Sequence, residues 1–285
     1  RLMNDRFALC LPREEFDEKR VADSIKELQR EFSGNSFHLH TYMGVYEIRD
    51  RDEAVSIMVD KANIAADTIK NNYDCCVAYY DEHLLEISIE QRRLLGEFEP
   101  ALQNDEFVMY LQPQVKRDGA AKGAEALVRW VHPSRGILTP YAFIDILENA
   151  GLIYKLDLYI WEKAAQKLAE WKEKGYGSYH ISVNISTKDF YIIDIYETFT
   201  GLINKYGIAA SNLHLEITET TLMTDFEKNM NIIHKLQGVG FRVEIDDFGS
   251  GYSSLNMLKD ISADVLKIDM GFLRKSENEV KGQDI

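Results

Sequence analysis

Cysteine is scarce in this sequence. The 285 residues contain three cysteines, Cys10, Cys75 and Cys76. Because their number is odd and two of them are adjacent, they predict neither a disulfide framework nor a cysteine-based zinc site. Such cysteine usage fits a reducing compartment, so we expect a cytoplasmic protein.

Long apolar segments are also absent. No run of about 18 apolar residues occurs, and no secretory signal peptide is visible at the beginning of the sequence. We therefore expect no membrane contact within this chain. The sequence begins with Arg1, which indicates a part of a longer protein, and an upstream segment of that parent could still anchor it in a membrane.

Positive charge is in short supply. The 33 Lys and Arg residues face 47 Asp and Glu residues, which gives a net charge of −14. This balance argues against electrostatic binding to duplex nucleic acid or to an anionic membrane. It leaves open a small anionic ligand that is bound through metal ions. The 45% hydrophobic content is sufficient for one large or two ordinary domains.

The sequence pattern predicts two domains. Residues 1–88 alternate between strand-like and helical segments, with strands expected at 6–12, 37–48 and 75–80 and helices at 14–32 and 54–69. A charged helical stretch at 86–102 follows, and we assign its residues 89–96 to a linker helix. The second domain then covers residues 97–285.

A regular alternation of strands and helices marks the second domain. Strands are predicted at 108–115, 124–130, 180–186, 213–220, 241–247 and 265–269, with helices at 142–149, 156–174, 191–206 and 226–237. This alternation favours a parallel-type sheet with helices outside it. The predicted fold class is therefore α/β.

Polar residues interrupt nearly every one of these strands. They are Glu125, Asn184, Glu216, the adjacent pair Asp246 and Asp247, and Lys267. Several are about 30 residues apart, which is about the length of one βα unit. One polar residue per strand would gather the set at one end of the sheet, as at the carboxyl-terminal face of a (β/α) barrel.

The chemistry of this set favours a metal site. Carboxylate and amide oxygens suit Mg²⁺ or Mn²⁺, and two such ions commonly serve in-line attack on a phosphodiester. The adjacent acids Asp246 and Asp247 repel one another unless a cation lies between them. A structural interpretation stays open for some members: Asn184 as a satisfied core amide, Glu216 and Glu219 as helix-capping acids, and Lys267 as a side chain whose stem lies on apolar surface.

The DFG and GSG tripeptides at 247–251 raise two other possibilities. A protein kinase would show a preceding glycine-rich loop, a strand lysine and an HRD-type loop, and the sequence has none of them. GSG is not followed by GK and Ser or Thr, which excludes a phosphate-binding P-loop.

From about residue 97 to its end, the chain resembles the EAL domain family. Six ordered motifs carry the resemblance: LQPQ at 111–114, EALVRW at 125–130, SVNIS at 182–186, LEITET at 215–220, IDDFGSGYSSL at 245–255 and LKID at 266–269. The resemblance implies a TIM-like (β/α) barrel with one antiparallel strand. It also implies a bacterial signalling enzyme, a phosphodiesterase that hydrolyses cyclic di-GMP to linear pGpG.

The resemblance assigns metal ligands. It implies that Glu125, Asn184, Glu216 and Asp246 hold a first Mg²⁺ or Mn²⁺ ion. Asp246 would bridge to a second ion, which Asp247 also binds.

Catalytic and substrate roles are implied as well. Lys267 would orient the attacking water or hydroxide, and Glu219 would tether the loop at 249–254, which in the family also serves a dimer contact. Gln112 and Arg129 resemble substrate contacts, and the guanidinium of Arg129 suits a phosphate. Leu127 is expected to pack. A homodimer through the EAL domain is thus expected, with cyclic di-GMP as the ligand.

Two departures from the family pattern stand out. The family barrel has two further βα units with another glutamate and a glutamine, so a chain that stops at Ile285 is expected to be truncated before them. Residues 1–88 resemble the last half of a GGDEF domain, whose motif would lie at Met3 to Phe7. The glycines of that motif are replaced and Arg6 stands for its glutamate, so we expect no cyclase activity.

A catalytically inactive sensor of cyclic di-GMP, or an interaction module, is the alternative function. The enzyme and the inactive sensor differ in whether the metal ligands are retained. Every ligand that can be checked in this sequence is present, which favours the enzyme.

Overall fold

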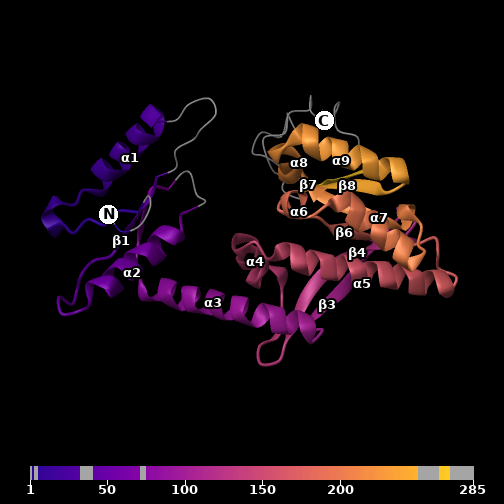
Figure 1. Cartoon of the computed structure of the whole chain (residues 1–285), viewed down its shortest axis with the longest axis horizontal. Helices are drawn as coiled ribbons and strands as arrows, with labels where there is room; N and C mark the ends of the chain where they lie inside the picture. The colour runs from indigo at the N-terminus through magenta and orange to yellow at the C-terminus, as the bar shows by residue number, and fades with distance from the viewer. Residues whose placement is uncertain (1, 3–5, 33–40, 71–74, 250–262, 270–285) are drawn as a thin grey trace. The chain divides into compact units, whose positions relative to one another are not determined.

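A computed structural model of the chain describes residues 2, 6–32, 41–70, 75–249 and 263–269. The chain divides into two compact units, Arg1–Leu94 and Leu95–Ile285. Figure 1 shows the helices and strands of both units.

The first unit is a small α/β module. The short strands β1 (Met43–Val45) and β2 (Val77–Tyr79) pair in parallel. The helices are α1 (Glu18–Phe32) and α2 (Val55–Asp67), with a 3-10 turn, η1 (Arg13–Glu15), before them. Helix α2 packs closely on β1, because a Cβ on Gly44 would fall 1.9 Å from the backbone oxygen of Ala62.

One predicted strand of this unit is wrong. Residues 6–12 form no strand, and the side chains of Phe7 and Leu9 are exposed. A strand needs a hydrogen-bonded neighbour as well as an apolar pattern, and within the described residues only β1 and β2 pair in this unit. The predicted strand at 37–48 is shorter than expected, with residues 37–40 outside the described part.

The predicted charged helix is confirmed as α3 (Glu82–Gln103). Its last turns belong to the second unit, where Phe98 packs edge-on against Phe107 with ring centroids 5.7 Å apart. The chain leaves α3 through Asp105, a residue with φ of 54°, and enters the first strand of the sheet.

The second unit is built on one mixed sheet. Its described strands run in the order β3-β4-β6-β7-β8-β9, with β5 beside β4. All neighbours from β4 to β9 along this path are parallel, whereas β3 and β5 are antiparallel to β4. The strands are β3 (Phe107–Val115), β4 (Ala121–His132), β5 (Gly136–Leu138), β6 (His180–Asn184), β7 (Leu213–Thr218), β8 (Arg242–Phe248) and β9 (Val265–Ile268).

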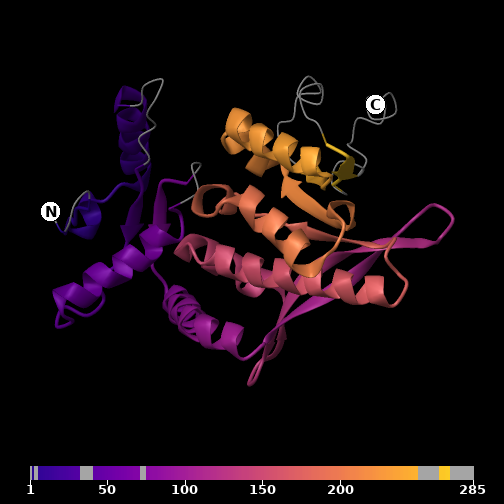
Figure 2. The same ribbon diagram turned by 45° about the vertical axis from the view of Figure 1, so that its right-hand side comes forward.

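Helices connect the parallel strands, as the sequence predicts. Helices α5, α7 and α9 lie side by side and pack against one face of the sheet (Figures 1 and 2). The α-helices after α3 are α4 (Ile144–Ala150), α5 (Ile153–Glu173), α6 (Asp189–Ile192), α7 (Ile195–Tyr206), α8 (Glu219–Thr224) and α9 (Phe226–Val239), with 3-10 turns η2 (Pro140–Ala142) and η3 (Ala210–Asn212). The mixed α/β fold with one sheet and outer helices agrees with the predicted class.

Local chemistry sets two helix boundaries that the sequence pattern did not show. The predicted helix at 191–206 is divided into α6 and α7, because the side chain of Asp194 caps α7 by accepting the backbone N–H of Glu197. The predicted strand at 213–220 ends at Thr218, whose side chain accepts the N–H of Thr221 and so caps α8.

Aromatic side chains fill the space between the sheet and the helices. Trp130 and Phe107 are fully buried, with ring centroids 4.7 Å apart. Further along the sheet, Trp161 of α5 packs against Phe199 of α7 in a tilted arrangement, with ring centroids 4.5 Å apart. The indole N–H of Trp161 donates a hydrogen bond of 2.9 Å to the backbone oxygen of Asn184, at the end of β6. This contact fixes the outer helix to the strand end that carries a predicted ligand.

Candidate active site

Lysine 267 brings two of the predicted site residues together. Its ammonium nitrogen lies 3.0 Å from Oε2 of Glu125, and it forms an ion pair with Oε1 of Glu216. The three side chains come from β4, β7 and β9, strands that are far apart in the sequence. The sheet therefore gathers these residues in one place, as the strand spacing predicts.

Strand register places the other predicted ligands beside them. Asn184 is the parallel neighbour of Glu216, and Asp246 is the neighbour of Thr218, two residues beyond Glu216 on β7. Since alternate residues of a strand share a face, Glu216 and Thr218 face the same side. On the antiparallel edge, Gln112 lies opposite Glu125. Within the described residues, Asn184 and Gln112 are placed beside the group by strand register rather than by a side-chain contact.

The backbone at Asp247 explains how two adjacent acids serve one site. Asp247 has φ of 54°, a left-handed conformation that is uncommon for residues other than glycine. The pairing of β8 with β9 is also irregular between Ile245 and Phe248. Both features interrupt the strand alternation at the point where the second carboxylate would otherwise point away. Strained backbone of this kind concentrates at functional sites.

The charges that act on Asp247 include those of Lys267 and Glu125. Burial, followed by the negative charges of Asp246 and Asp269, raises the pKa of the Asp247 carboxyl. Lys267 opposes this rise, and Glu125 adds to it. Near the end of β8, acidic side chains therefore outnumber the one lysine that opposes their charge.

Glu216 is the most deeply buried carboxyl group of the set. Its side chain is fully buried, and neither oxygen forms a hydrogen bond of normal geometry within the described residues. Burial raises its pKa to about 8, although the charge of Lys267 opposes the rise and Glu125 and Asp246 add to it. A buried carboxylate that needs more positive charge than its surroundings provide is suited to a cation.

The charged state of Lys267 is favoured despite its burial. Desolvation lowers the pKa of this lysine, but the charge and close contact of Glu216, together with the hydrogen bond to Glu125, outweigh desolvation and raise the pKa overall. The ammonium group therefore stays protonated between the carboxyl groups of Glu125 and Glu216.

The residues present fit a divalent metal ion. The group offers carboxylate oxygens and one nearby amide, the hard donors that Mg²⁺ and Mn²⁺ prefer. The two buried oxygens of Glu216 lack hydrogen bonds of normal geometry, and this shortage is what a cation would relieve. Glu125, Asn184, Glu216, Asp246 and Asp247 are the residues that would hold such ions.

Glu219 lies at the start of α8, directly after β7. It is buried, and its Oε2 has no hydrogen bond of normal geometry in the described part of the chain. Neither Glu216 nor Glu219 caps this helix, because Thr218 does so. Of the predicted loop at 249–254 that Glu219 is expected to tether, residues 250–254 lie outside the described residues.

Two predicted substrate contacts lie on the antiparallel edge. The guanidinium of Arg129 lies 5.7 Å from the centre of the exposed Tyr110 ring on β3, and it donates a hydrogen bond to the oxygen of Val128. Gln112 is exposed on the same strand as Tyr110, while Leu127 is partly buried. Gln112 and Arg129 therefore lie on the flank of the group formed by Glu125, Glu216 and Lys267, outside the contacts that join those three side chains.

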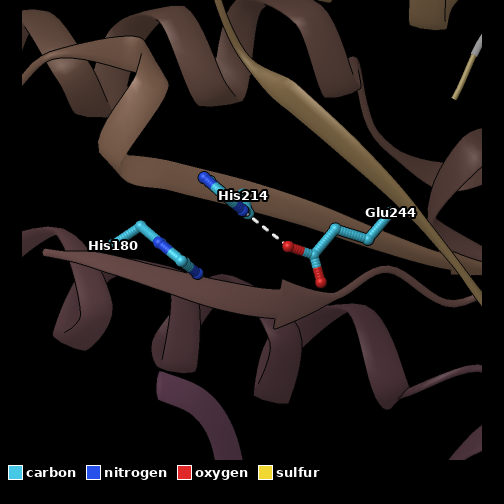
Figure 3. A group of neighbouring side chains, drawn as sticks. All are labelled: His180, His214 and Glu244. Atoms are coloured by element: carbon cyan, nitrogen blue, oxygen red, sulfur yellow. Dashed lines mark hydrogen bonds and ion pairs between the residues drawn. The ribbon is translucent and has the colours of Figure 1, made fainter. Parts of the chain in front are cut away.

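The sequence interpretation missed a second polar group next to the first. His180, His214 and Glu244 lie together and are buried, in a cluster whose ligand atoms are all within 4.8 Å of one another (Figure 3). The signal was present in the strand sequences, because each residue lies two or four positions before a predicted ligand and therefore on the same strand face.

The altered GGDEF motif includes residues 3–5, outside the described residues. No helix in the described ranges combines the length and apolar character that crossing a membrane requires.

Comparisons with known proteins identify relatives among signalling proteins. MucR of Pseudomonas aeruginosa, a bifunctional diguanylate cyclase/cyclic di-GMP phosphodiesterase, is 33% identical over 212 residues, which cover 74% of this chain and 30% of MucR. The cyclic di-GMP phosphodiesterase PdeR of Escherichia coli is 31% identical over 185 residues, 65% of this chain and 28% of PdeR. The chain thus spans about a third of the length of such relatives.

Solved structures show the same fold. The MucR phosphodiesterase in complex with c-di-GMP matches with a TM-score of 0.61 and 35% identity, over 64% of this chain and 74% of that one. An S helix-GGDEF-EAL structure of Vibrio cholerae LapD matches with a TM-score of 0.60 over 93% of this chain and 63% of that one. At 17% identity, the LapD likeness shows the fold alone, but it extends into the first unit and is compatible with a GGDEF-like segment there.

The EAL domain matches residues 96–285, which begin in α3 and include the whole sheet of the second unit. The six motifs, the mixed sheet with its antiparallel strand and the convergence of Glu125, Glu216 and Lys267 fall within this range. The chain belongs to the EAL domain family.

Proposed function

We propose that the protein hydrolyses one phosphodiester bond of cyclic di-GMP to give linear pGpG, with two Mg²⁺ or Mn²⁺ ions. The observation that carries the proposal is the convergence of Lys267 with Glu125 and Glu216 beside the strained end of β8. The descriptions of MucR and PdeR as cyclic di-GMP phosphodiesterases support the substrate.

The proposed roles follow from the chemistry of each side chain. Glu125, Asn184, Glu216 and Asp246 would hold one ion, and Asp246 and Asp247 would hold the other. Ions of this type neutralise phosphate charge and lower the pKa of water. Arg129, on the flank of the site, has the planar guanidinium suited to a phosphate, and the amide of Gln112 would contact the same substrate.

Lys267 has the proposed role of orienting the nucleophile. Its ammonium group is held between two carboxylates, so it can donate a hydrogen bond to a water oxygen next to them. In the reaction this oxygen forms a bond to phosphorus, the bond from phosphorus to the ribose 3′ oxygen breaks, and the 3′ oxygen takes a proton. The lysine thus acts at the attacking atom, whereas the carboxylates act through the ions.

The test is chromatography of the nucleotide products with Mg²⁺ or Mn²⁺ supplied. We expect pGpG from the protein, and its loss in a Glu125→Gln variant. Glu162→Gln is the matched control, because Glu162 is a carboxylate on α5 that pairs with Lys205 instead. If cyclic di-GMP binds but stays intact with both metals, the enzymatic proposal is wrong and the protein is a sensor.

A further inference from the structure

Beside the proposed catalytic residues lies a second layer of polar side chains. His180, His214 and Glu244 belong to the neighbouring parallel strands β6, β7 and β8. They precede the predicted ligands Asn184, Glu216 and Asp246 by four, two and two residues, so each shares a strand face with one of them. The layer therefore lies toward the amino-terminal ends of the strands.

All three side chains are buried, with exposures of 6%, 2% and 2%. The imidazole rings of His180 and His214 stack with centroids 3.8 Å apart and planes 2° from parallel. Nδ1 of His214 lies 2.5 Å from Oε1 of Glu244. Figure 3 shows the two rings lying parallel, with the Glu244 carboxylate turned toward the His214 ring.

The position of His180 is built into the sheet. Its Nε2 lies 2.7 Å from the amide oxygen of Gln114, and the Gln114 amide nitrogen donates to the hydroxyl of Ser182 at 3.2 Å. Gly123 on β4 leaves room for the ring, because a Cβ there would fall 2.5 Å from the atoms of His180. Three strands thus hold this imidazole in place.

A layer that served only to pack the interior would not need two imidazoles and a carboxylate. Oε2 of Glu244 is buried without a hydrogen bond of normal geometry, and the ammonium nitrogen of Lys267 is 4.0 Å away. A buried carboxylate oxygen that lacks a hydrogen bond of normal geometry is costly. Burial, with a contribution from His214, lowers the pKa of His180 to about 4. His180 is therefore neutral at pH 7 and is able to act as a nitrogen ligand.

We propose that His180, His214 and Glu244 form a binding site for a divalent transition ion of the Zn²⁺ type, distinct from the Mg²⁺ or Mn²⁺ site. Two imidazoles and one carboxylate are the donor set that such ions prefer, whereas Mg²⁺ prefers oxygen alone. The amide oxygen of Gln114, already at His180 Nε2, is available as a fourth donor. The site would join β6, β7 and β8 through one ion.

Binding would exchange protons for the metal. The contacts between His214 and Glu244 and between His180 and Gln114 each join a nitrogen to an oxygen, with a proton between them. An ion would take the place of the proton at each of these nitrogens, and each imidazole would keep a proton on its other ring nitrogen and so remain a neutral ligand. The lone pairs of the stacked rings lie in parallel planes. Because Gln114 and Gly123 hold the His180 ring, it is the His214 ring that must turn so that both nitrogens face the ion.

The probe is Co²⁺, whose visible absorption reports nitrogen and oxygen ligation, followed by competition with Zn²⁺. The protein carries Asp246→Asn and Asp247→Asn so that the proposed oxygen site is disabled. We expect one Co²⁺ per chain, displaced by Zn²⁺ but not by excess Mg²⁺. His214→Asn should weaken Co²⁺ binding by ~100-fold or more.

His132→Gln is the matched control, because His132 is a buried imidazole with a carboxylate neighbour, Glu97, at 3.0 Å but lies outside the layer. It should bind Co²⁺ as the parent does. Glu244→Gln is the milder variant if His214→Asn fails to fold, since glutamine still accepts a hydrogen bond from His214.

Three results would overturn the proposal. They are the absence of a Co²⁺ spectrum in the parent, unchanged Co²⁺ affinity in Glu244→Gln, and a Tm that Zn²⁺ leaves unchanged in the parent. The Tm measurement needs no substitution in the layer and so stands even if those variants misfold. None of the readouts depends on phosphodiesterase activity, so failure of the proposed function leaves them intact.

Discussion

The buried carboxyl group of Glu216 should make stability depend on pH in an unusual direction. Its pKa is raised by burial from 4.5 to about 8 in the folded protein. Between these two values the folded protein retains a proton that the unfolded chain has released. The free energy of unfolding should therefore fall as the pH rises from about 5 to 8.

The size of this effect follows from the shift. A change from 4.5 to about 8 corresponds to up to about 5 kcal/mol at pH 8 and above. This is comparable with the total stability of many domains. Without divalent ions, the protein should be distinctly less stable at pH 8 than at pH 6, and added Mg²⁺ or Mn²⁺ should restore stability at pH 8.

The assay is urea unfolding at several pH values with a chelator present, for the protein and for Glu216→Gln. The uncharged amide cannot titrate, so the variant should gain stability relative to the parent as the pH rises. Glu244→Gln is the control, because this equally buried carboxyl has a pKa that is lowered, despite burial, by its hydrogen bond to His214. Removing Glu244 should shift stability without changing its slope over this range. Parallel pH profiles for the parent and Glu216→Gln would refute the reasoning.

Three further results are expected. Lys267→Ala should slow single turnover with Mg²⁺ by ~10²–10⁴-fold. The affinity for cyclic di-GMP, measured by calorimetry with Ca²⁺, should change only a few-fold. If binding is lost while the rate stays normal, the lysine binds the substrate instead of orienting the nucleophile. Asp247→Val should lose ~1–3 kcal/mol in urea unfolding because of the φ of 54°, whereas Asp247→Asn should lose little, and equal losses would contradict the strain. Gly123→Ala should destabilise by ~1–3 kcal/mol through its clash with the His180 ring, and the same change in a His180→Ala background should cost much less if that contact is the cause.

The strand-and-helix alternation made the second unit predictable. Every predicted strand from 108 to 269 is present, because each apolar run finds a parallel or antiparallel neighbour in one sheet. The segment at 6–12 has a similar apolar pattern but joins neither of the described sheets, so it forms no strand. Strand formation depends on neighbours that a local pattern does not contain.

The site was predictable only in part. Residue spacing placed Glu125, Glu216 and Lys267 at one end of the sheet, but not the ion pairs that join them. Those contacts depend on which strands become neighbours and how far each side chain reaches. The layer of His180, His214 and Glu244 was missed because a histidine or a glutamate inside a strand can serve several structural or functional roles. Only the proximity of the three side chains in the folded protein marks them as one group.

The hydrogen bond from Trp161 to the backbone of Asn184 gives the molecule an optical reporter. The fluorescence of a buried indole responds to changes in the strength of the hydrogen bond that its N–H donates. Because the accepting oxygen belongs to a proposed ligand residue at the end of β6, movement of that strand end should alter the Trp161 emission. With Trp130 and Trp171, the other two of the three tryptophans, replaced by phenylalanine, occupancy of the site becomes visible without a label, substrate or product.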